Sequence, residues 1–110
     1  MRQIEIEMND AVRNKIAWSK SNTLTTFDNT LEHCFIYLHG NHIATYKYAD
    51  GSLTLKDGGW QSRTTKRRLN ALLSAFTFNG LSVVQKNWNW FIRDNDFNKR
   101  PVPFVSGMTV

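Results

Sequence analysis

The sequence predicts a single α+β domain in which an antiparallel sheet packs against two helices. Apolar residues recur every three or four positions in residues 2–19 and again from Leu69 to Phe76, whereas the stretch between them alternates with a period of two. Turn-forming pairs such as Asp50-Gly51 separate the period-two segments. The 110 residues, 41% of them hydrophobic, are enough for one core and too few for two domains.

The N-terminal segment, residues 2–19, is predicted to be a helix. Its apolar stripe consists of Ile4, Met8, Val12 and Ile16, spaced by four residues. Ile4, Ile6 and Met8 also alternate with polar residues, which leaves open a short strand followed by a helix from Asn9. We favour the helix.

Four strands are expected next, because the segments are rich in β-branched or aromatic residues at a period of two. They are Leu24–Phe27, His33–His39, Ile43–Tyr48 and Ser52–Leu55. The pairs Asp28-Asn29, Gly40-Asn41 and Asp50-Gly51 mark the turns between them. Short turns of this kind predict an antiparallel meander.

The clearest helix follows the turn signal Asp57-Gly58-Gly59. Its apolar stripe is Leu69, Leu72, Leu73 and Phe76, at positions i, i+3, i+4 and i+7. The hydroxyl of Thr64 or Thr65 is expected to cap its first turn, and Asn79-Gly80 is expected to end it.

A strand pair and a tail complete the chain. The strands are predicted at Leu81–Gln85 and Trp88–Ile92, with a turn at Lys86-Asn87, which gives the order α-β-β-β-β-α-β-β. Residues 1–93 are expected to form the compact domain. Residues 94–110 are expected to be an extended tail, because their two prolines disfavour a helix.

The strongest functional signal is the basic segment at the start of the second predicted helix. Cations there oppose the positive end of the helix dipole, so helix stability does not explain them. Free backbone N–H groups, hydroxyls and basic side chains together suit a phosphate or a carboxylate. The candidate contacts to nucleic acid or another anionic partner are Arg63, Thr64, Thr65, Lys66, Arg67 and Arg68. The competing interpretation is a solvated basic face that keeps the protein soluble.

The position of the basic segment at the start of a helix also predicts an effect on stability. Replacing Lys66, Arg67 and Arg68 with alanine removes cations from the positive end of a helix dipole. The triple substitution is therefore expected to leave the melting temperature unchanged or to raise it.

Aromatic residues give the second signal. Tyr46, Tyr48 and Trp60 are candidates for stacking on bases. Trp88 and Trp90 are two positions apart and are predicted to share one face of a strand. Core packing is the favoured interpretation of that face, since two helices need an apolar layer to cover.

Metal and catalytic motifs are weak. His33, Cys34, His39 and His42 lie within ten residues, but Cys34 would point away from His33 and His39 on a strand, so no metal site is predicted. A metal nuclease of the Asp…Glu-x-Lys type needs an acid where Thr54 precedes Lys56 by two residues. Phosphate-binding loops and nucleophile elbows are also missing. We expect neither an enzyme nor a cofactor.

Charge and hydropathy limit the partners. The formal net charge of +5 and the sequence pI near 9.7 permit a polyanionic partner. The longest apolar runs, such as Cys34–Leu38, are far shorter than the roughly 18 residues that span a bilayer, so no membrane partner is expected. The N-terminus lacks the pattern of a secretory signal, and a single cysteine suits a reducing compartment. The expected location is the cytoplasm.

Several motifs resemble those of a family of small proteins encoded by tailed phages. They are Tyr37-Leu38-His39-Gly40-Asn41, Gly58-Gly59-Trp60-Gln61-Ser62, Thr64-Thr65-Lys66, Arg68-Leu69-Asn70-Ala71-Leu72, Gln85-Lys86 and Trp90-Phe91. The likeness covers nearly the whole chain, including Val102-Pro103-Phe104 and Ser106-Gly107. The resemblance implies synthesis in a bacterial host cell and a binding role, and it supplies no catalytic residue.

Three functions follow from these observations. The leading hypothesis is a protein that contacts the backbone of DNA or RNA through the basic segment. The alternative is an inhibitor, similar in role to anti-CRISPR proteins, that binds an acidic or nucleic-acid-binding surface of a host nuclease or polymerase. A third possibility is a structural or assembly component of the phage. A basic stripe that reaches Lys47, Lys56 or Lys86 favours nucleic acid, whereas a compact patch beside exposed apolar residues favours a protein.

Overall fold

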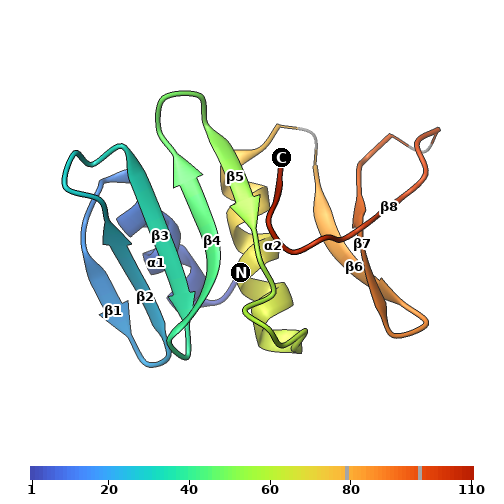
Figure 1. Ribbon diagram of the computed structural model, residues 1–110, viewed down its shortest axis with the longest axis horizontal. Coiled ribbons are helices and arrows are strands. Elements are labelled where there is room, and N and C mark those ends of the chain that lie inside the picture. Colours follow the sequence, from blue (N-terminus) through green and yellow to red (C-terminus); the bar gives the residue numbers. More distant parts are fainter. Residues whose placement is uncertain (79, 97) are drawn as a thin grey trace.

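The computed structural model describes residues 1–78, 80–96 and 98–110, and it confirms the α+β class (Figure 1). The elements are α1 (Gln3–Arg13), β1 (Trp18–Lys20), β2 (Thr23–Phe27), β3 (His33–Leu38), β4 (Asn41–Lys47), β5 (Ser52–Leu55), α2 (Arg63–Phe76), β6 (Ser82–Lys86), β7 (Asn89–Arg93), β8 (Val102–Pro103) and β9 (Met108–Thr109). Strands β1 to β5 form an antiparallel meander that β9 extends to six strands. The strand pair after α2 forms a separate sheet with β8.

Helix α1 ends earlier than the apolar spacing predicts. Lys15 has a left-handed backbone with φ of 55°, and the N–H of Ile16 donates to the carbonyl of Ala11 at 2.9 Å. This 6→1 hydrogen bond is that of a Schellman motif, which ends a helix. Ile16 is therefore exposed, and Trp18 begins an additional strand that pairs with β2. The prediction of a helix through residue 19 is wrong.

Helix α2 follows the prediction closely. Leu69, Leu72 and Leu73 are fully buried, as their spacing indicates. The N-cap is Ser62, whose hydroxyl accepts a hydrogen bond from the N–H of Thr65 at 3.1 Å. The cap was expected from a threonine, so this detail is corrected. The helix ends at Phe76, and Asn79 of the predicted stop signal lies outside the described residues.

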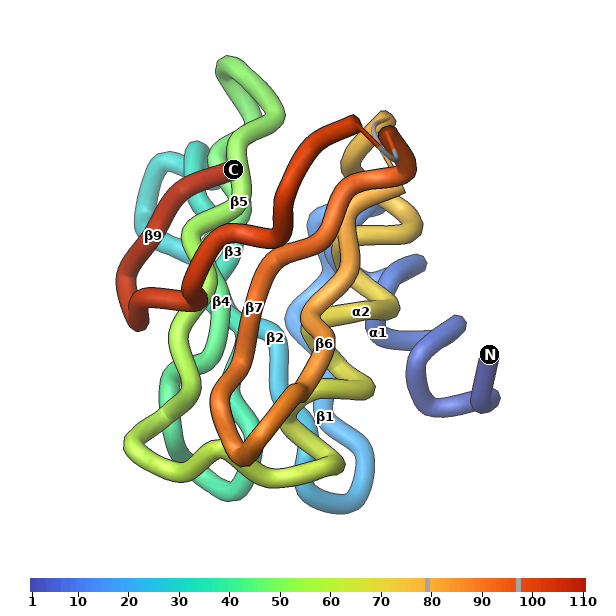
Figure 2. Tube along the Cα trace, turned by 90° about the vertical axis from the view of Figure 1, so that its right-hand side faces the viewer, coloured from blue at the N-terminus to red at the C-terminus, as the bar shows by residue number. Residues whose placement is uncertain are grey.

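Both helices cover the same face of the six-stranded sheet (Figures 1 and 2). The core between them contains Met8, Val12, Ile36, Ile43, Leu53, Leu55, Leu69 and Leu72. The C-terminal residues are extended. They add β8 to β7 and β9 to β5, and Phe104 and Met108 pack against the core. The opposite face of β2, β3 and β4 has no helix or strand over it in the part of the chain that the structure describes.

The antiparallel topology gathers the connections at two ends of the molecule. At the lower end in Figure 1 lie the β1–β2 and β3–β4 turns, the β5–α2 loop, the start of α2 and the β6–β7 turn. At the upper end lie the β2–β3, β4–β5 and β7–β8 connections and the end of α2. The predicted basic segment therefore shares its end with three other connections that are distant in sequence.

Candidate nucleic-acid interface

The lower end carries a concentration of positive charge, and we call it the basic end. Lys20, beside the β1–β2 turn, pairs with Glu7 at 2.7 Å, and the five other cations of this end are Lys56, Arg63, Lys66, Arg67 and Lys86. Within the described ranges, none of these five forms an ion pair. Asp57, the acid of the β5–α2 loop, accepts hydrogen bonds from the N–H of Gly59 at 2.8 Å and from the amide of Gln61 at 3.3 Å. The basic end therefore has uncompensated positive charge.

The predicted basic segment divides into accessible and buried residues. Arg63 is exposed, and Thr64, Lys66 and Arg67 are partly exposed. Thr65 is buried, and its hydroxyl is 2.9 Å from the hydroxyl of Ser62 in the helix cap. Thr65 therefore supports the start of α2 and cannot contact a ligand directly.

Arg68 is the main correction to the predicted site. Its Nη1 lies 2.8 Å from Glu5 Oε2 in α1, and its Nε donates to the hydroxyl of Thr23 in β2 at 3.1 Å. The side chains of Arg68 and Glu5 are only 5% and 7% exposed. Arg68 is thus a buried link between both helices and the sheet, and its assignment to the interface is wrong.

The burial of Arg68 also overturns the expected effect of the triple alanine substitution. Alanine at this position leaves the Glu5 carboxylate buried without its partner, which typically costs about 3–5 kcal/mol. Helical spacing contains a signal for this burial, because Arg68 is three residues after Thr65 and four before Leu72, both buried.

Asn70 links α2 to β6 of the second sheet and so fixes the relative height of the basic residues on these two elements. Its side-chain amide accepts from the N–H of Val83 at 2.6 Å and donates to the carbonyl of Val83 at 3.1 Å. Going from Asn70 back to Arg63 covers about 10.5 Å along the helix. Going from Val83 forward to Lys86 covers about 10 Å along β6, in the same direction. Arg63 and Lys86 therefore lie at the same level of the molecule.

Two exposed tryptophans lie at the basic end. Trp60, predicted as a stacking residue, is 75% exposed in the β5–α2 loop, and Trp88 is 88% exposed at the tip of the β6–β7 hairpin. The turn consists of Asn87 and Trp88, with φ of 52° and 68°, instead of the predicted Lys86-Asn87. Trp88 therefore does not share a strand face with Trp90, which is buried against Phe104.

The other two predicted stacking residues belong to a different part of the molecule. The rings of Tyr46 and Tyr48 pack edge to face with their centroids 4.9 Å apart, and the ring centroids of Tyr46 and Phe76 are 4.8 Å apart. The hydroxyl of Tyr48 donates to the carbonyl of Val12, and burial raises the pKa of Tyr48 above its usual range. Both rings join the sheet to the helices near the upper end, so their predicted stacking role is not supported by their position.

The histidines and Cys34 do not converge. His33 Nδ1 lies 2.7 Å from Asp28 Oδ2, His42 Nε2 donates to the carbonyl of Ala44 at 2.9 Å, and His39 Nε2 is 3.3 Å from the amide of Asn22. Cys34 is fully buried, and burial raises the pKa of its thiol to about 12. Metal-binding atoms of Asp28, Glu32 and His33 lie within 4.8 Å of one another, but the Asp28 carboxylate already accepts from Glu32 N–H and pairs with His33.

Comparison with known proteins gives one family. The sequence model of the family described as Kyanoviridae Gp96 protein matches residues 1–110. No curated protein and no solved structure matches the chain. In the described part of the chain, neither helix has the length and apolar character needed to cross a membrane. The expected resemblance to a small tailed-phage protein is confirmed.

Proposed function

Since the chain belongs to the Kyanoviridae Gp96 protein family, it is a small phage protein, and we propose that it binds nucleic acid at its basic end. Arg63, Lys66 and Arg67 contact the phosphate backbone, and Trp60 and Trp88 stack on bases. The observation that carries this proposal is the gathering of five unpaired cations and two exposed tryptophans at one end of the described chain.

The breadth of the basic end supports a polyanion. The cations extend from Lys56 at the end of β5, through the first turns of α2, to Lys86 at the β6–β7 hairpin. Lys47 is not part of this region, because it lies at the other end, 3.9 Å from Asp50. A region that spans three separate elements can contact several phosphates, and phosphate contacts supply most of the affinity of non-specific binding.

Trp88 supports a binding role because fold stability does not explain it. Two-residue hairpin turns with positive φ at both positions favour glycine or asparagine, and a bulky side chain is unfavourable there. The ring of Trp88 is 88% exposed, so burial of apolar surface does not offset this cost. Strained residues of this kind are frequent at binding sites.

An acidic host protein is the competing partner, since exposed tryptophan and arginine are also enriched in protein interfaces. Fluorescence anisotropy with labelled single-stranded DNA, single-stranded RNA and duplex DNA separates the two. With about four phosphates neutralised, affinity should fall about a hundredfold between about 50 and about 200 mM salt. Absence of binding at the lower salt concentration contradicts the proposal and favours a protein partner.

A pair of triple variants locates the contact. The basic-end variant carries Arg63→Gln, Lys66→Gln and Arg67→Gln. Its matched control, with Lys15→Gln, Arg93→Gln and Lys99→Gln, removes the same charge from the opposite end. The basic-end variant should lose most of its affinity, and the slope of log affinity against log salt should shrink by about 2–3. Equal losses in the two variants contradict a localised site.

A further inference from the structure

The uncovered face of the six-stranded sheet carries a row of rings, which we call the aromatic ribbon. It consists of His33, Phe35 and Tyr37 of β3 and His42 of β4, and His42 contacts both Phe35 and Tyr37. The ring centroids of His33 and Phe35 are 6.3 Å apart. Those of Phe35 and His42 are 5.8 Å apart, and those of Tyr37 and His42 are 5.2 Å apart. Strand alternation explains the row, since positions 33, 35 and 37 share one face.

All four rings are only partly exposed, because they shield one another. Both helices lie on the other side of the sheet (Figure 2). The fold does not require this arrangement, since a solvent-facing sheet surface is normally polar. A contiguous set of aromatic rings on such a surface is typical of a binding face.

The charges around the aromatic ribbon favour an anionic ligand. In the described strands β2 to β5, no position on this face holds a carboxylate, and the nearest one, Asp28, follows β2 and contacts His33 at the end of the ribbon away from the basic end. Burial lowers the pKa of His42, and the nearby charge of Lys56 lowers it further. Lys56 itself belongs to the basic end. A cation therefore lies beside the ribbon where it approaches the β3–β4 turn.

His42 also presents a hydrogen-bonding group to a ligand. The carbonyl of Ala44 can only accept, so the 2.9 Å contact places the proton on Nε2. In neutral His42, Nδ1 is therefore an acceptor, and it has no hydrogen-bond partner among the described residues. Such an atom suits the amino group of a base.

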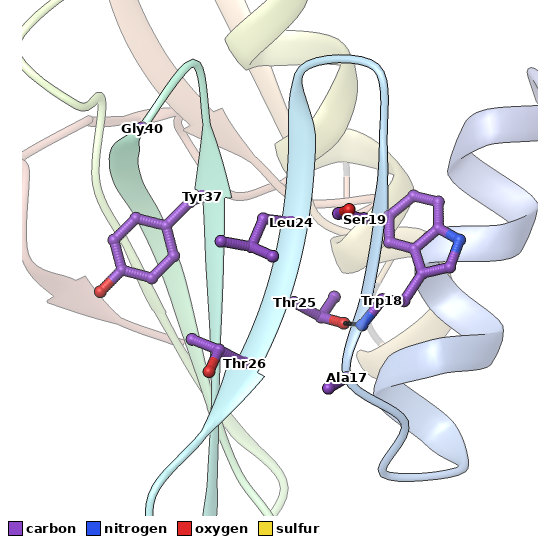
Figure 3. Close-up of a pocket in the computed structure, with 8 residues that line it drawn as sticks. All are labelled: Ala17, Trp18, Ser19, Leu24, Thr25, Thr26, Tyr37 and Gly40. Atoms are coloured by element: carbon purple, nitrogen blue, oxygen red, sulfur yellow. Dashed lines mark hydrogen bonds between the residues drawn. The ribbon is translucent and has the colours of Figure 1, made fainter.

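A groove over β1 and β2 begins beside Tyr37 of the aromatic ribbon and runs toward the β1–β2 turn. One part, of about 620 Å³, is lined by Trp18, Leu24, Thr26 and Tyr37 among others. Figure 3 shows Leu24, Thr26 and Tyr37 on the uncovered side of the strands, with Trp18 turned toward α1. A second part, of about 710 Å³, shares Leu24 and Gly40 with the first and continues to Asn22 and His39. These last residues lie at the β1–β2 and β3–β4 turns of the basic end.

We propose that the uncovered face binds unpaired bases, so that the ligand at the basic end is single-stranded nucleic acid. This inference rests on the proposed function and adds the form of the strand. Bases stack on Tyr37 and Phe35, while the backbone continues past Lys56 toward Trp60 and the start of α2. Stacking on a sheet requires exposed base faces, which a duplex does not offer along its length.

The test replaces rings and keeps the strand apolar, with Phe35→Leu, Tyr37→Leu and the double variant. Two controls are matched to them: Tyr37→Phe keeps the ring, and Thr54→Val changes the same sheet face outside the ribbon. Each lost ring should weaken binding of single-stranded oligonucleotides about tenfold. The affinity of the ring variants for duplex DNA should not change. The melting temperature of the two controls should equal that of the wild-type protein. The same titrations with single-stranded DNA and with single-stranded RNA show which sugar is preferred.

Several results would overturn the inference. Unchanged single-strand affinity in a folded Tyr37→Leu protein excludes the ribbon, and equal losses for duplex and single strands do the same. A wild-type dimer that dissociates in the double variant, seen by sedimentation, identifies a second copy of the chain as the occupant. Wild-type protein that binds duplex but not single strands contradicts this inference alone, whereas binding to neither contradicts the proposed function as well.

If the double variant fails to fold, NMR of the wild-type protein decides the question. The ring signals of Tyr37 and Phe35 should shift when a single-stranded oligonucleotide is added, and unshifted signals contradict the inference.

Discussion

The two ends of the molecule are built alike, from hairpin connections and one end of α2, but they treat charge differently (Figure 1). At the upper end, Lys47 pairs with Asp50 at 3.9 Å and Lys99 with Asp94 at 3.6 Å. At the basic end, Lys20 pairs with Glu7 at 2.7 Å, while five further cations have no ion pair in the described structure. Arg93 and Arg100 of the upper end also have no ion pair among the described residues, so the two ends differ in how many unpaired cations they carry.

The same contrast appears between two neighbours in α2. Arg67 is partly exposed and has no acidic partner within the described ranges, whereas Arg68 is buried with Glu5. One step along a helix rotates the side chain by about 100°, which is enough to move it from the surface to the core. The basic segment is therefore a mixture of a surface and a structural residue, and experiments must separate them.

The largest expected effect comes from separating these two arginines. Arg68→Ala should lower the free energy of unfolding by about 3–5 kcal/mol, because Glu5 stays buried and unpaired. Arg67→Ala should change it by no more than about 0.5 kcal/mol. Chemical denaturation of both variants measures the difference. If Arg68→Ala is as stable as Arg67→Ala, the buried link is not what holds α1 to α2.

A smaller effect is expected at the tip of the β6–β7 hairpin. Trp88→Gly should raise the free energy of unfolding by about 0.5–1 kcal/mol, since glycine adopts the positive φ of this turn without strain. The same variant should bind nucleic acid about tenfold more weakly through the loss of one stacking ring. Thermal melting and anisotropy on one preparation give both values. A variant that binds as well as wild type removes Trp88 from the interface.

The smallest expected effects concern pH and the upper end. A hydrogen bond from His33 lowers the pKa of Asp28 below its usual value. A lowered carboxyl pKa stabilises the fold above about pH 3.9, and this contribution is lost as pH falls through the native pKa. Asp28→Asn should therefore flatten the decline of stability in acid. A melting curve against pH that is the same for both proteins contradicts this assignment.

His42 gives a second pH dependence in a different range. Its pKa is lowered in the fold, so protonation opposes folding, and stability should decline as pH falls below about 6.5. The decline should be absent in His42→Gln, measured by thermal melting at closely spaced pH values. An unchanged profile in that variant would assign the decline to another group.

Local patterns in the sequence predicted much of this fold. The leucine stripe of α2 and the alternation of β2 to β5 are set by neighbours within one turn or one strand, so they were found. The end of α1 was missed because a lysine takes the left-handed position that glycine usually marks. The pair of β6 and β7 was predicted, but its third strand was missed, because β8 comes from the C-terminal residues and no local pattern encodes that contact.

The candidate site was predicted in part for the same reason. Arg63, Lys66 and Arg67 were found as a run of charge, and Trp60 as a nearby ring. Arg68 was misassigned because its partner Glu5 is 63 residues away in sequence. Lys56, Lys86 and Trp88 belong to the basic end only because the hairpins are arranged around α2. Their proximity in space could not be predicted from the sequence.

The most direct test of binding at the basic end uses the four tryptophans as reporters. Trp60 and Trp88 are exposed there, whereas Trp90 is buried and Trp18 packs against the core. Their indole N–H signals can be followed by two-dimensional NMR while an oligonucleotide is added. The variants Trp60→Phe and Trp88→Phe each lack one signal and so assign it. We predict that the indole signals of Trp60 and Trp88 shift when the oligonucleotide is added, while that of Trp90 does not. Binding that leaves both exposed indoles unshifted would contradict the account.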